Sequence, residues 1–128
     1  MVDLKEYNPL THAVIGCAMR VHRALGPGFP EIIYQRALVV ELSRESIAAQ
    51  REVALPVYYR LEQVGSRRVD FLVDSRVIVE LKAVSALTVA HQTQVLNYLE
   101  SFRIPVGLLL NFGSPRLEYK RLLKSLPG

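Results

Sequence analysis

Residues 106–110 read Val-Gly-Leu-Leu-Leu, an uninterrupted run without polar side chains that has the length of a strand. A strand with one face in water alternates apolar and polar residues, whereas a strand buried on both faces has no need to. The run begins after Pro105 and gives way to the turn-forming residues 111–115. It therefore predicts a sheet that is covered on both faces by other elements.

Three segments carry apolar residues at the spacing of a helix face. The first is predicted to have Asn8 as its N-cap and Pro9 as its first helical residue, and to end at residues 26–28, Gly-Pro-Gly. The second begins near Pro30 and has apolar residues on more than one side, so we expect it to be largely buried. The third covers residues 87–102.

Between the second and third helices the apolar period changes to two, which is typical of strands. Residues 51–59 form a strand in which Pro56 favours an edge position or a bulge. The pair Gly65-Ser66 is expected to turn the chain, and residues 67–73 and 77–84 then form a hairpin around a short turn. A more charged strand follows the apolar run. The order of helix, helix, three strands, helix and two strands predicts an α/β sandwich around a mixed sheet.

Size and composition favour one intracellular domain over residues 1–128, because half of the residues are apolar, enough for a single core. A net charge of +4 and a pI near 9.5 favour an anionic partner. Cys17 is the only cysteine, which excludes an internal disulfide and a cysteine-based zinc or iron–sulfur centre. The sequence shows no signal peptide and no apolar run of about 20 residues, so we expect a cytoplasmic protein that does not contact a membrane.

Two charged residues stand inside the apolar strand at 77–84. Glu80 and Lys82 are two residues apart and therefore share one face of the strand. Burying such a pair costs several kcal/mol unless something compensates. Asp70 on the preceding strand is expected to face the same side, and two close carboxylates repel each other unless a divalent cation relieves the repulsion. The sequence therefore predicts a metal site at Asp70 and Glu80.

The candidate ligands of this site are carboxylate oxygens, with the backbone carbonyl of Leu81 as a further donor. Oxygen donors without paired histidines or cysteines favour a hard cation, so Mg²⁺ or Mn²⁺ is the expected cofactor. Such an ion polarises a phosphoryl oxygen and activates its bound water, while a neighbouring ammonium group stabilises the growing negative charge. We assign the second role to Lys82.

Asp70, followed by Glu80-Leu81-Lys82, resembles the Asp and Glu-x-Lys signature of the PD-(D/E)xK nuclease superfamily. Four further segments are similar to the GxxExxY family, a small branch of that superfamily: residues 21–28, 28–38, 91–99 and 107–113. The resemblance spans nearly the whole chain. It implies a restriction-endonuclease-like core with the element order ααβββαββ.

The resemblance also implies roles for further residues. It makes Glu31 the acid that completes the metal shell and Lys82 the catalytic lysine. Gln94 and Tyr98 match the Q-x-x-x-Y element of RecB-like nucleases, which helps to orient the active site and contacts the nucleic-acid backbone. The implied activity is Mg²⁺-assisted hydrolysis of phosphodiester bonds in nucleic acid, with DNA favoured over RNA.

Two more residues are candidates for support or for backbone contact. Tyr34 ends the GxxExxY motif, and Arg68 precedes the strand aspartate and can meet phosphates. A tyrosine at helical spacing is equally typical of a core aromatic, and an arginine beside a turn is commonly only solvated. His22 and His91 lie too far apart to be read as a metal pair, so we leave both out of the ligand set.

Structural interpretations of the acidic residues stay open at this point. Glu31 taken alone is compatible with an acid that complements a helix dipole, and Glu80 with Lys82 is compatible with a structural ion pair. A module that keeps the fold and binds nucleic acid or protein without cleaving is the second hypothesis, and a subunit of a larger assembly is the third. A homodimer is expected, because small nucleases often need a second protomer to embrace a duplex.

Overall fold

The computed structural model describes residues 3–124 of the chain. Within that range the elements follow the order helix, helix, three strands, helix and two strands that the apolar periods predict, after a short 3-10 turn, η1 (Leu4–Glu6). The larger elements are α1 (Asn8–Leu25), α2 (Glu31–Arg44), β1 (Ala49–Tyr59), β2 (Glu62–Val73), β3 (Val77–Lys82), α3 (Val89–Phe102), β4 (Val106–Asn111) and β5 (Glu118–Leu123).

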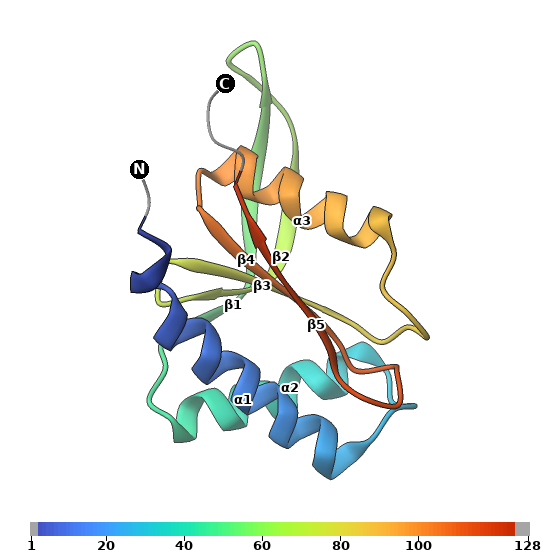
Figure 1. The fold of residues 1–128 in the computed structure, drawn as a ribbon. Helices are drawn as coiled ribbons and strands as arrows, with labels where there is room; N and C mark the ends of the chain where they lie inside the picture. The colour runs from blue at the N-terminus through green and yellow to red at the C-terminus, as the bar shows by residue number, and fades with distance from the viewer. Residues whose placement is uncertain (1–2, 125–128) are drawn as a thin grey trace.

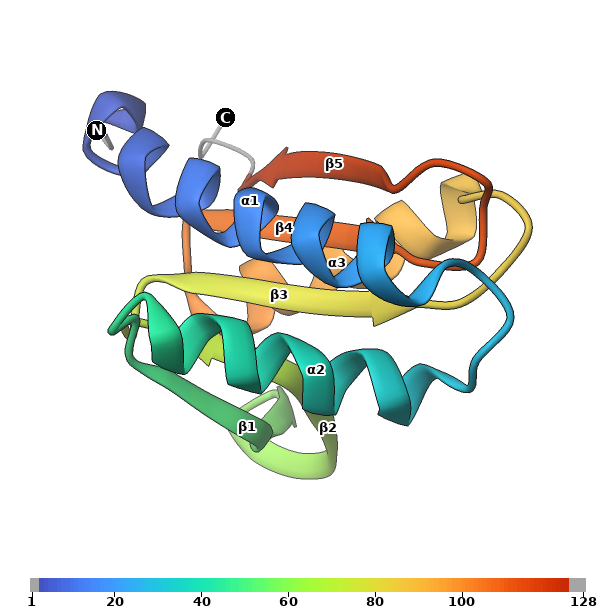
Figure 2. The same ribbon diagram turned by 90° about the horizontal axis from the view of Figure 1, so that it is seen from below.

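The five strands form one mixed sheet in the order β1-β2-β3-β4-β5. β3 and β4 run parallel, with α3 as the crossover between them, and the other neighbouring pairs are antiparallel. α1 and α2 cover one face of the sheet, and α3 lies on the other (Figures 1 and 2). This arrangement confirms the expected α/β sandwich and the restriction-endonuclease-like fold.

β4 is buried along its whole length, as its apolar run predicts. Leu108 and Leu110 pack into the hydrophobic cluster beneath α1 and α2, whereas Leu109 packs into the cluster beneath α3. Full burial of a leucine side chain contributes roughly 1.5–3 kcal/mol. The two clusters thus hold β4 from both sides, together with β3 beside it in the centre of the sheet.

The start of α1 differs by one residue from the sequence expectation. Tyr7 occupies the N-cap position, and Asn8 is the first helical residue. The Asn8 side chain accepts a hydrogen bond from Arg121 on β5 at 2.7 Å, so it ties the helix to the sheet instead of capping its own helix.

The expectation that α2 is largely buried is wrong. Its buried residues are Tyr34, Gln35, Leu38 and Leu42, which lie along one side, whereas Val40 is 56% exposed. The reason is that α2 lies at the outside of the sandwich, where only its inner side meets the sheet and α1 (Figure 2).

The turn between β1 and β2 lies at Arg60-Leu61, so the predicted turn at Gly65-Ser66 is wrong. The pair Gly65-Ser66 is part of β2 and pairs with β1. Arg60 and Leu61 have φ angles of 49° and 70°, as a tight two-residue hairpin turn requires. The prediction failed because β-bulges favour the same residues as turns. Here the pairing of β1 with β2 shifts register between Val57 and Tyr58, next to Gly65.

The displaced turn makes the β1–β2 hairpin longer than expected. Its outer part projects beyond the rest of the molecule (Figure 1), and we call residues 53–68 the hairpin arm. β1 lies at an edge of the sheet, which confirms the edge position that Pro56 predicts.

Gly113, just after β4, provides a test of how closely the chain packs behind the sheet. A Cβ at this position would lie 2.4 Å from both the backbone N and the backbone O of Val84. We expect Gly113→Ala to lower the free energy of unfolding by about 2–3 kcal/mol, measured by chemical denaturation. Gly65→Ala is the matched control, because nothing lies within 4 Å of its Cβ. Equal stability of the two variants would contradict the close approach.

Candidate active site

The centre of the site is the point where β2 and β3 stop pairing. Their ladder runs from Val73–Val77 to Phe71–Val79 and then ends. Beyond it, the side chain of Glu80 accepts a hydrogen bond from Asp70 N at 2.7 Å, and the side chain of Asp70 accepts one from Leu81 N at 2.8 Å. Carboxylates thus replace the carbonyl groups that would continue the ladder, so the two acids are fixed where the strands part.

At this point the inward-packing side chains of β2 switch from one face of the sheet to the other. Phe71 packs into the cluster beneath α1 and α2, whereas Val69 packs into the cluster beneath α3. On β1, the residue between the partners of Phe71 and Val69 is Glu52, which has a φ of 49°. Asp70 therefore lies at a kink that is accessible from both helical layers.

Lys82 lies on the α3 side of the sheet. Its Nζ donates a hydrogen bond to Oε1 of Gln94 at 3.0 Å, and Ile78, which shares the parity of Lys82 on β3, packs beneath α3. Glu80 has the same parity, as the period of two predicts. The structure thus places Gln94 of α3 in hydrogen-bonding contact with Lys82, although the two residues lie 12 positions apart in sequence.

α2 approaches the same carboxylates from the opposite layer. Glu31 is its first residue, and Gln35, one turn later, donates from Nε2 to Oδ1 of Asp70 at 3.3 Å. Arg51 on β1 in turn donates to Oε1 of Gln35 at 2.7 Å. The arginine fixes which end of the buried Gln35 amide faces Asp70, because an arginine can only donate.

The three carboxyl groups perturb one another. Burial and then the neighbouring Asp70 raise the pKa of Glu80 to about 8. Burial also raises the pKa of Asp70, opposed first by the hydrogen bond from Leu81 N and then by Lys82. Although Glu31 is largely exposed as a residue, desolvation and then Asp70 raise the pKa of its carboxyl, while Lys82 lowers it. Glu31, Asp70, Glu80 and Lys82 therefore lie within electrostatic reach of one another.

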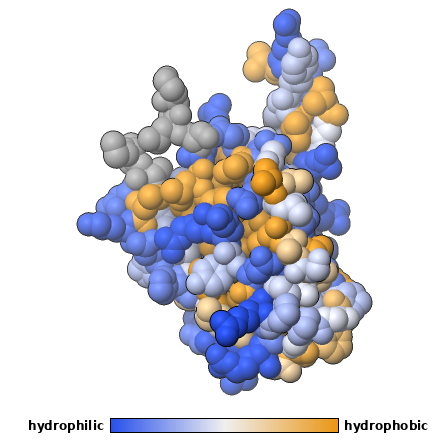
Figure 3. Space-filling model, turned by 45° about the vertical axis from the view of Figure 1, so that its right-hand side comes forward, coloured by the Kyte–Doolittle hydropathy of each residue, from blue (hydrophilic) through white to orange (hydrophobic). Residues whose placement is uncertain are grey.

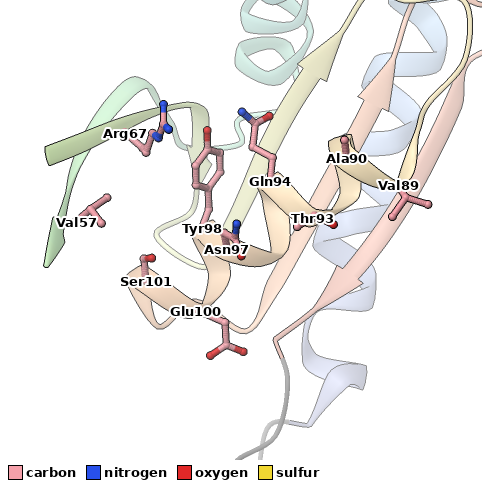
Figure 4. A pocket seen from close by; sticks show the side chains of 10 residues that line it. All are labelled: Val57, Arg67, Val89, Ala90, Thr93, Gln94, Asn97, Tyr98, Glu100 and Ser101. Atoms are coloured by element: carbon pink, nitrogen blue, oxygen red, sulfur yellow. The ribbon is translucent and has the colours of Figure 1, made fainter. Parts of the chain in front are cut away.

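Tyr98 connects the carboxylates to an adjoining groove. Burial, and then the charge of Glu80, raise the pKa of the Tyr98 hydroxyl. The positive charge of Arg67 acts in the opposite direction and lowers that pKa. The groove has a volume of about 750 Å³ and lies between α3 and the hairpin arm. Figure 4 shows Tyr98 and Gln94 on α3, with the Tyr98 hydroxyl directed toward Arg67 on the arm.

The remaining candidates are placed as follows. Tyr34 is fully buried and its hydroxyl bonds to Gly26 O and Phe29 N, so it fastens the loop that leads to Glu31. Arg68 is exposed on the arm, and its Nη1 lies 3.9 Å from Oε2 of Glu52. The arginine that lines the groove is its neighbour, Arg67.

The two histidines left out of the ligand set both have structural partners. His22 is hydrogen-bonded to Ser114 O, and His91 forms a capping box with Thr88 at the start of α3.

Sequence reasoning missed two functional neighbours, Gln35 and Asn111. The signal for Gln35 was its spacing of four residues from Glu31, which places both on one helix face. Asn111 lies opposite Lys82 in the parallel ladder, and its fully buried amide bonds to the N and O of Val84 and to Glu118. Asn111 thus holds the connection from β3 to α3 in place. In the sequence, a polar residue at the end of a strand does not by itself indicate this role.

The donor chemistry of the site fits a hard divalent cation. Carboxylate oxygens are the ligands that Mg²⁺ and Mn²⁺ prefer, and crowded carboxylates with raised pKa values gain from a nearby cation. Among residues 3–124 no three acidic, histidine or cysteine side chains are already arranged to hold an ion. The bonds of Asp70 and Glu80 to backbone N–H groups occupy only part of the acceptor capacity of the two carboxylates, so lone pairs remain for an ion.

Comparisons with known proteins identify the family. The profile described as the PD-(D/E)XK nuclease superfamily matches residues 8–122. A solved structure, described as the crystal structure of SSO0001, is similar with a TM-score of 0.60 and 19% sequence identity, over 74% of this chain and 50% of that chain. That likeness shows a shared fold, and the present chain spans about half the length of that protein. A search of the curated proteins gives no match.

A mixed sheet between helical layers, with an acid and a lysine on its central strand, defines the restriction-endonuclease-like class. The chain belongs to the PD-(D/E)XK nuclease superfamily. The nucleases of this superfamily generally use divalent metals. None of the helices within residues 3–124 is both long and apolar enough to cross a membrane.

Glu80→Gln tests the electrostatic account through stability. Because the pKa of Glu80 is raised in the folded protein to about 8, the folded state binds more protons than the unfolded state between pH 4.5 and that value. Stability is therefore lost as the pH rises through this window. Glutamine keeps an acceptor for Asp70 N without the negative charge. The free energy of unfolding of the metal-free variant should therefore exceed that of wild type by on the order of 3 kcal/mol at pH 8.

The measurement is urea denaturation in EDTA at several pH values. The advantage of Glu80→Gln should be small near pH 5 and should grow up to about pH 8. Gln50→Ala, exposed on β1, removes no titratable group, so it is the control and should show no such trend. A pH-independent difference between wild type and Glu80→Gln would refute a protonated Glu80 in the metal-free fold.

Proposed function

We propose that this chain is a divalent-metal-dependent nuclease that hydrolyses phosphodiester bonds in DNA. The observation that carries the proposal is the arrangement around β3. Two interlocked acids, Asp70 and Glu80, lie beside Lys82, whose ammonium group is held by Gln94. A purely structural ion pair would need neither two crowded acids nor a third, Glu31, brought from another helix.

In this proposal Glu31, Asp70 and Glu80 hold Mg²⁺ or Mn²⁺, with the backbone carbonyl of Leu81 as a further donor. When bound, the ion polarises a phosphoryl oxygen and lowers the pKa of its water. A cation bound by the carboxylates would relieve the repulsion between them. The kink at Asp70 supports this assignment, because it gives α2 access to the strand carboxylates.

Lys82 supplies the fixed positive charge of the site. An ammonium group has three donor hydrogens, and the hydrogen bond to Gln94 uses one of them. The others are free to donate to phosphoryl oxygens as negative charge builds up. Gln94 therefore orients the lysine. Because the pKa of the Tyr98 hydroxyl is raised, this hydroxyl stays protonated and able to donate a hydrogen bond to a phosphate.

The motif order along the chain supports assignment to the GxxExxY branch. The contacts of Tyr34 favour its role as support, because its hydroxyl holds the loop before Glu31. Arg68 is proposed as a phosphate contact, since its long, exposed pair with Glu52 is worth little in water. The single domain, the homodimer and the cytoplasmic location stay predictions, and light scattering tests the homodimer.

Cleavage assays with matched variants test the proposal directly. Wild type should cut labelled single-stranded, duplex or branched DNA with Mg²⁺ or Mn²⁺ and not with EDTA. Lys82→Ala should lower the rate by about 100-fold or more, and Glu80→Ala should abolish it with the loss of a metal ligand. Lys120→Ala, on the exposed part of β5, is the control and should cut normally. Intact DNA with metal-insensitive binding would instead identify a non-cleaving module.

Gln35 provides a test of how the site is preorganised. Gln35→Ala removes the hydrogen bond that orients Asp70, so the apparent affinity for Mg²⁺ should fall about tenfold, measured by titrating cleavage against Mg²⁺. Arg51→Ala should act in the same direction and more weakly, because it only orients the glutamine. Gln50→Ala, exposed on β1, is the control. Unchanged Mg²⁺ dependence in Gln35→Ala would remove Gln35 from the site.

A further inference from the structure

The tip of the hairpin arm exposes several large aromatic and apolar side chains. Tyr58 and Tyr59 are 62% and 64% exposed, and Leu61 and Val64 are 97% and 63% exposed. Figure 3 shows the arm projecting at the upper right, with hydrophobic residues among hydrophilic ones. Several exposed aromatic and apolar side chains gathered on one projecting element indicate a place of interaction.

The charge of the arm favours an anionic partner. Arg60, Arg67 and Arg68 are opposed within residues 53–68 by one acid, Glu62. Arg60 lies over the ring of Tyr59, 5.7 Å from its centre. Within the described part of the chain, neither Arg60 nor Arg67 forms a salt bridge.

The groove between the arm and α3 lies beside the candidate active site. Arg67 and Val57 line it from the arm, and Asn97, Tyr98 and Gln94 line it from α3 (Figure 4). The groove therefore adjoins the candidate active site through Gln94, the side chain that bonds to Lys82. A volume of about 750 Å³ is in the range that holds a molecule the size of one or two nucleotides.

The combination of exposed tyrosines and unpaired arginines distinguishes between forms of nucleic acid. An aromatic side chain stacks on the face of a base, and a base shows its face only where it is unpaired and unstacked. A duplex encloses its bases and presents mainly phosphates and sugars, so it offers no base faces on which these tyrosines could stack. The groove and the arm thus fit one strand with splayed bases better than they fit an intact duplex.

We infer that the hairpin arm and the groove beside α3 bind single-stranded DNA. Bases stack on Tyr58 and Tyr59, and Arg60 and Arg67 contact the phosphates between the arm and the active site. The inference rests on the proposed function, since it names the form of substrate that reaches Lys82. It adds a binding surface that lies outside the acid and lysine cluster.

The test measures binding without cleavage, by fluorescence anisotropy in EDTA with the full chain. The probes are a labelled thymine oligonucleotide of about a dozen nucleotides, a duplex of the same length and a uracil RNA. Wild type should bind the single-stranded DNA at least about tenfold more tightly than the duplex. Tyr58→Ala and Tyr59→Ala should each weaken single-strand binding by about tenfold, and Arg67→Gln should weaken it and reduce its dependence on salt.

The controls are Tyr119→Ala on β5 and Arg23→Gln on α1, both exposed and remote from the groove, and both should bind as wild type does. Thermal melting of every variant checks the fold. Duplex binding as tight as single-strand binding, equal binding by arm and control variants, or self-association that depends on the tyrosines would overturn the inference. Tighter binding of the RNA probe would overturn the assignment to DNA.

A separate assay on wild type distinguishes this inference from the proposed function. Hydrolysis of bis(p-nitrophenyl) phosphate with Mn²⁺ tests the metal-dependent chemistry on a diester too small to need the arm. Hydrolysis together with unaltered binding by the arm variants would refute the inference and keep the nuclease. Weakened binding by the arm variants without any hydrolysis of diester or DNA would keep the binding surface and refute the nuclease.

Discussion

The site depends on two hydrogen bonds, in which the carboxylate of Glu80 accepts from Asp70 N and the carboxylate of Asp70 accepts from Leu81 N. Each acid completes its bond to the backbone of the neighbouring strand where the β2–β3 ladder ends. A buried N–H group without a partner costs about 1–3 kcal/mol, so the carboxylates satisfy the backbone where the strands part. The same geometry crowds two acids next to Lys82. The backbone bonds that satisfy the parting strands therefore also gather carboxylate oxygens at one point of the sheet.

The two helical layers and the neighbouring strands hold this crowded centre in place. From α2, Gln35 bonds to Asp70 and is itself oriented by Arg51. From α3, Gln94 holds Lys82, while the buried amide of Asn111 fastens the connection between β3 and that helix. Since these contacts come from elements that are far apart in sequence, the site forms only when the whole sandwich has assembled.

Local patterns predicted the element order and the shared face of Glu80 and Lys82, because both follow from the periods of helices and strands. They failed where a residue has a tertiary partner. Asn8 bonds to Arg121 rather than capping α1, and the pair Gly65-Ser66 accommodates a bulge rather than a turn. Gln35 was missed although it lies four residues after Glu31, because its contact with Asp70 depends on the kink in that strand. Periodicity shows which side a residue faces, but not which distant side chain it meets.

A crystal structure with Mn²⁺, analysed by the anomalous scattering of the ion, tests the central claim most directly. The account predicts an anomalous peak at oxygens of Asp70 and Glu80, with Glu31 drawn in as a further ligand and Lys82 still beside the carboxylates. The same experiment on Glu80→Gln should show a weaker peak or none. A peak elsewhere, or a fully occupied peak in the variant, would contradict the claim that these acids form the metal site of a nuclease.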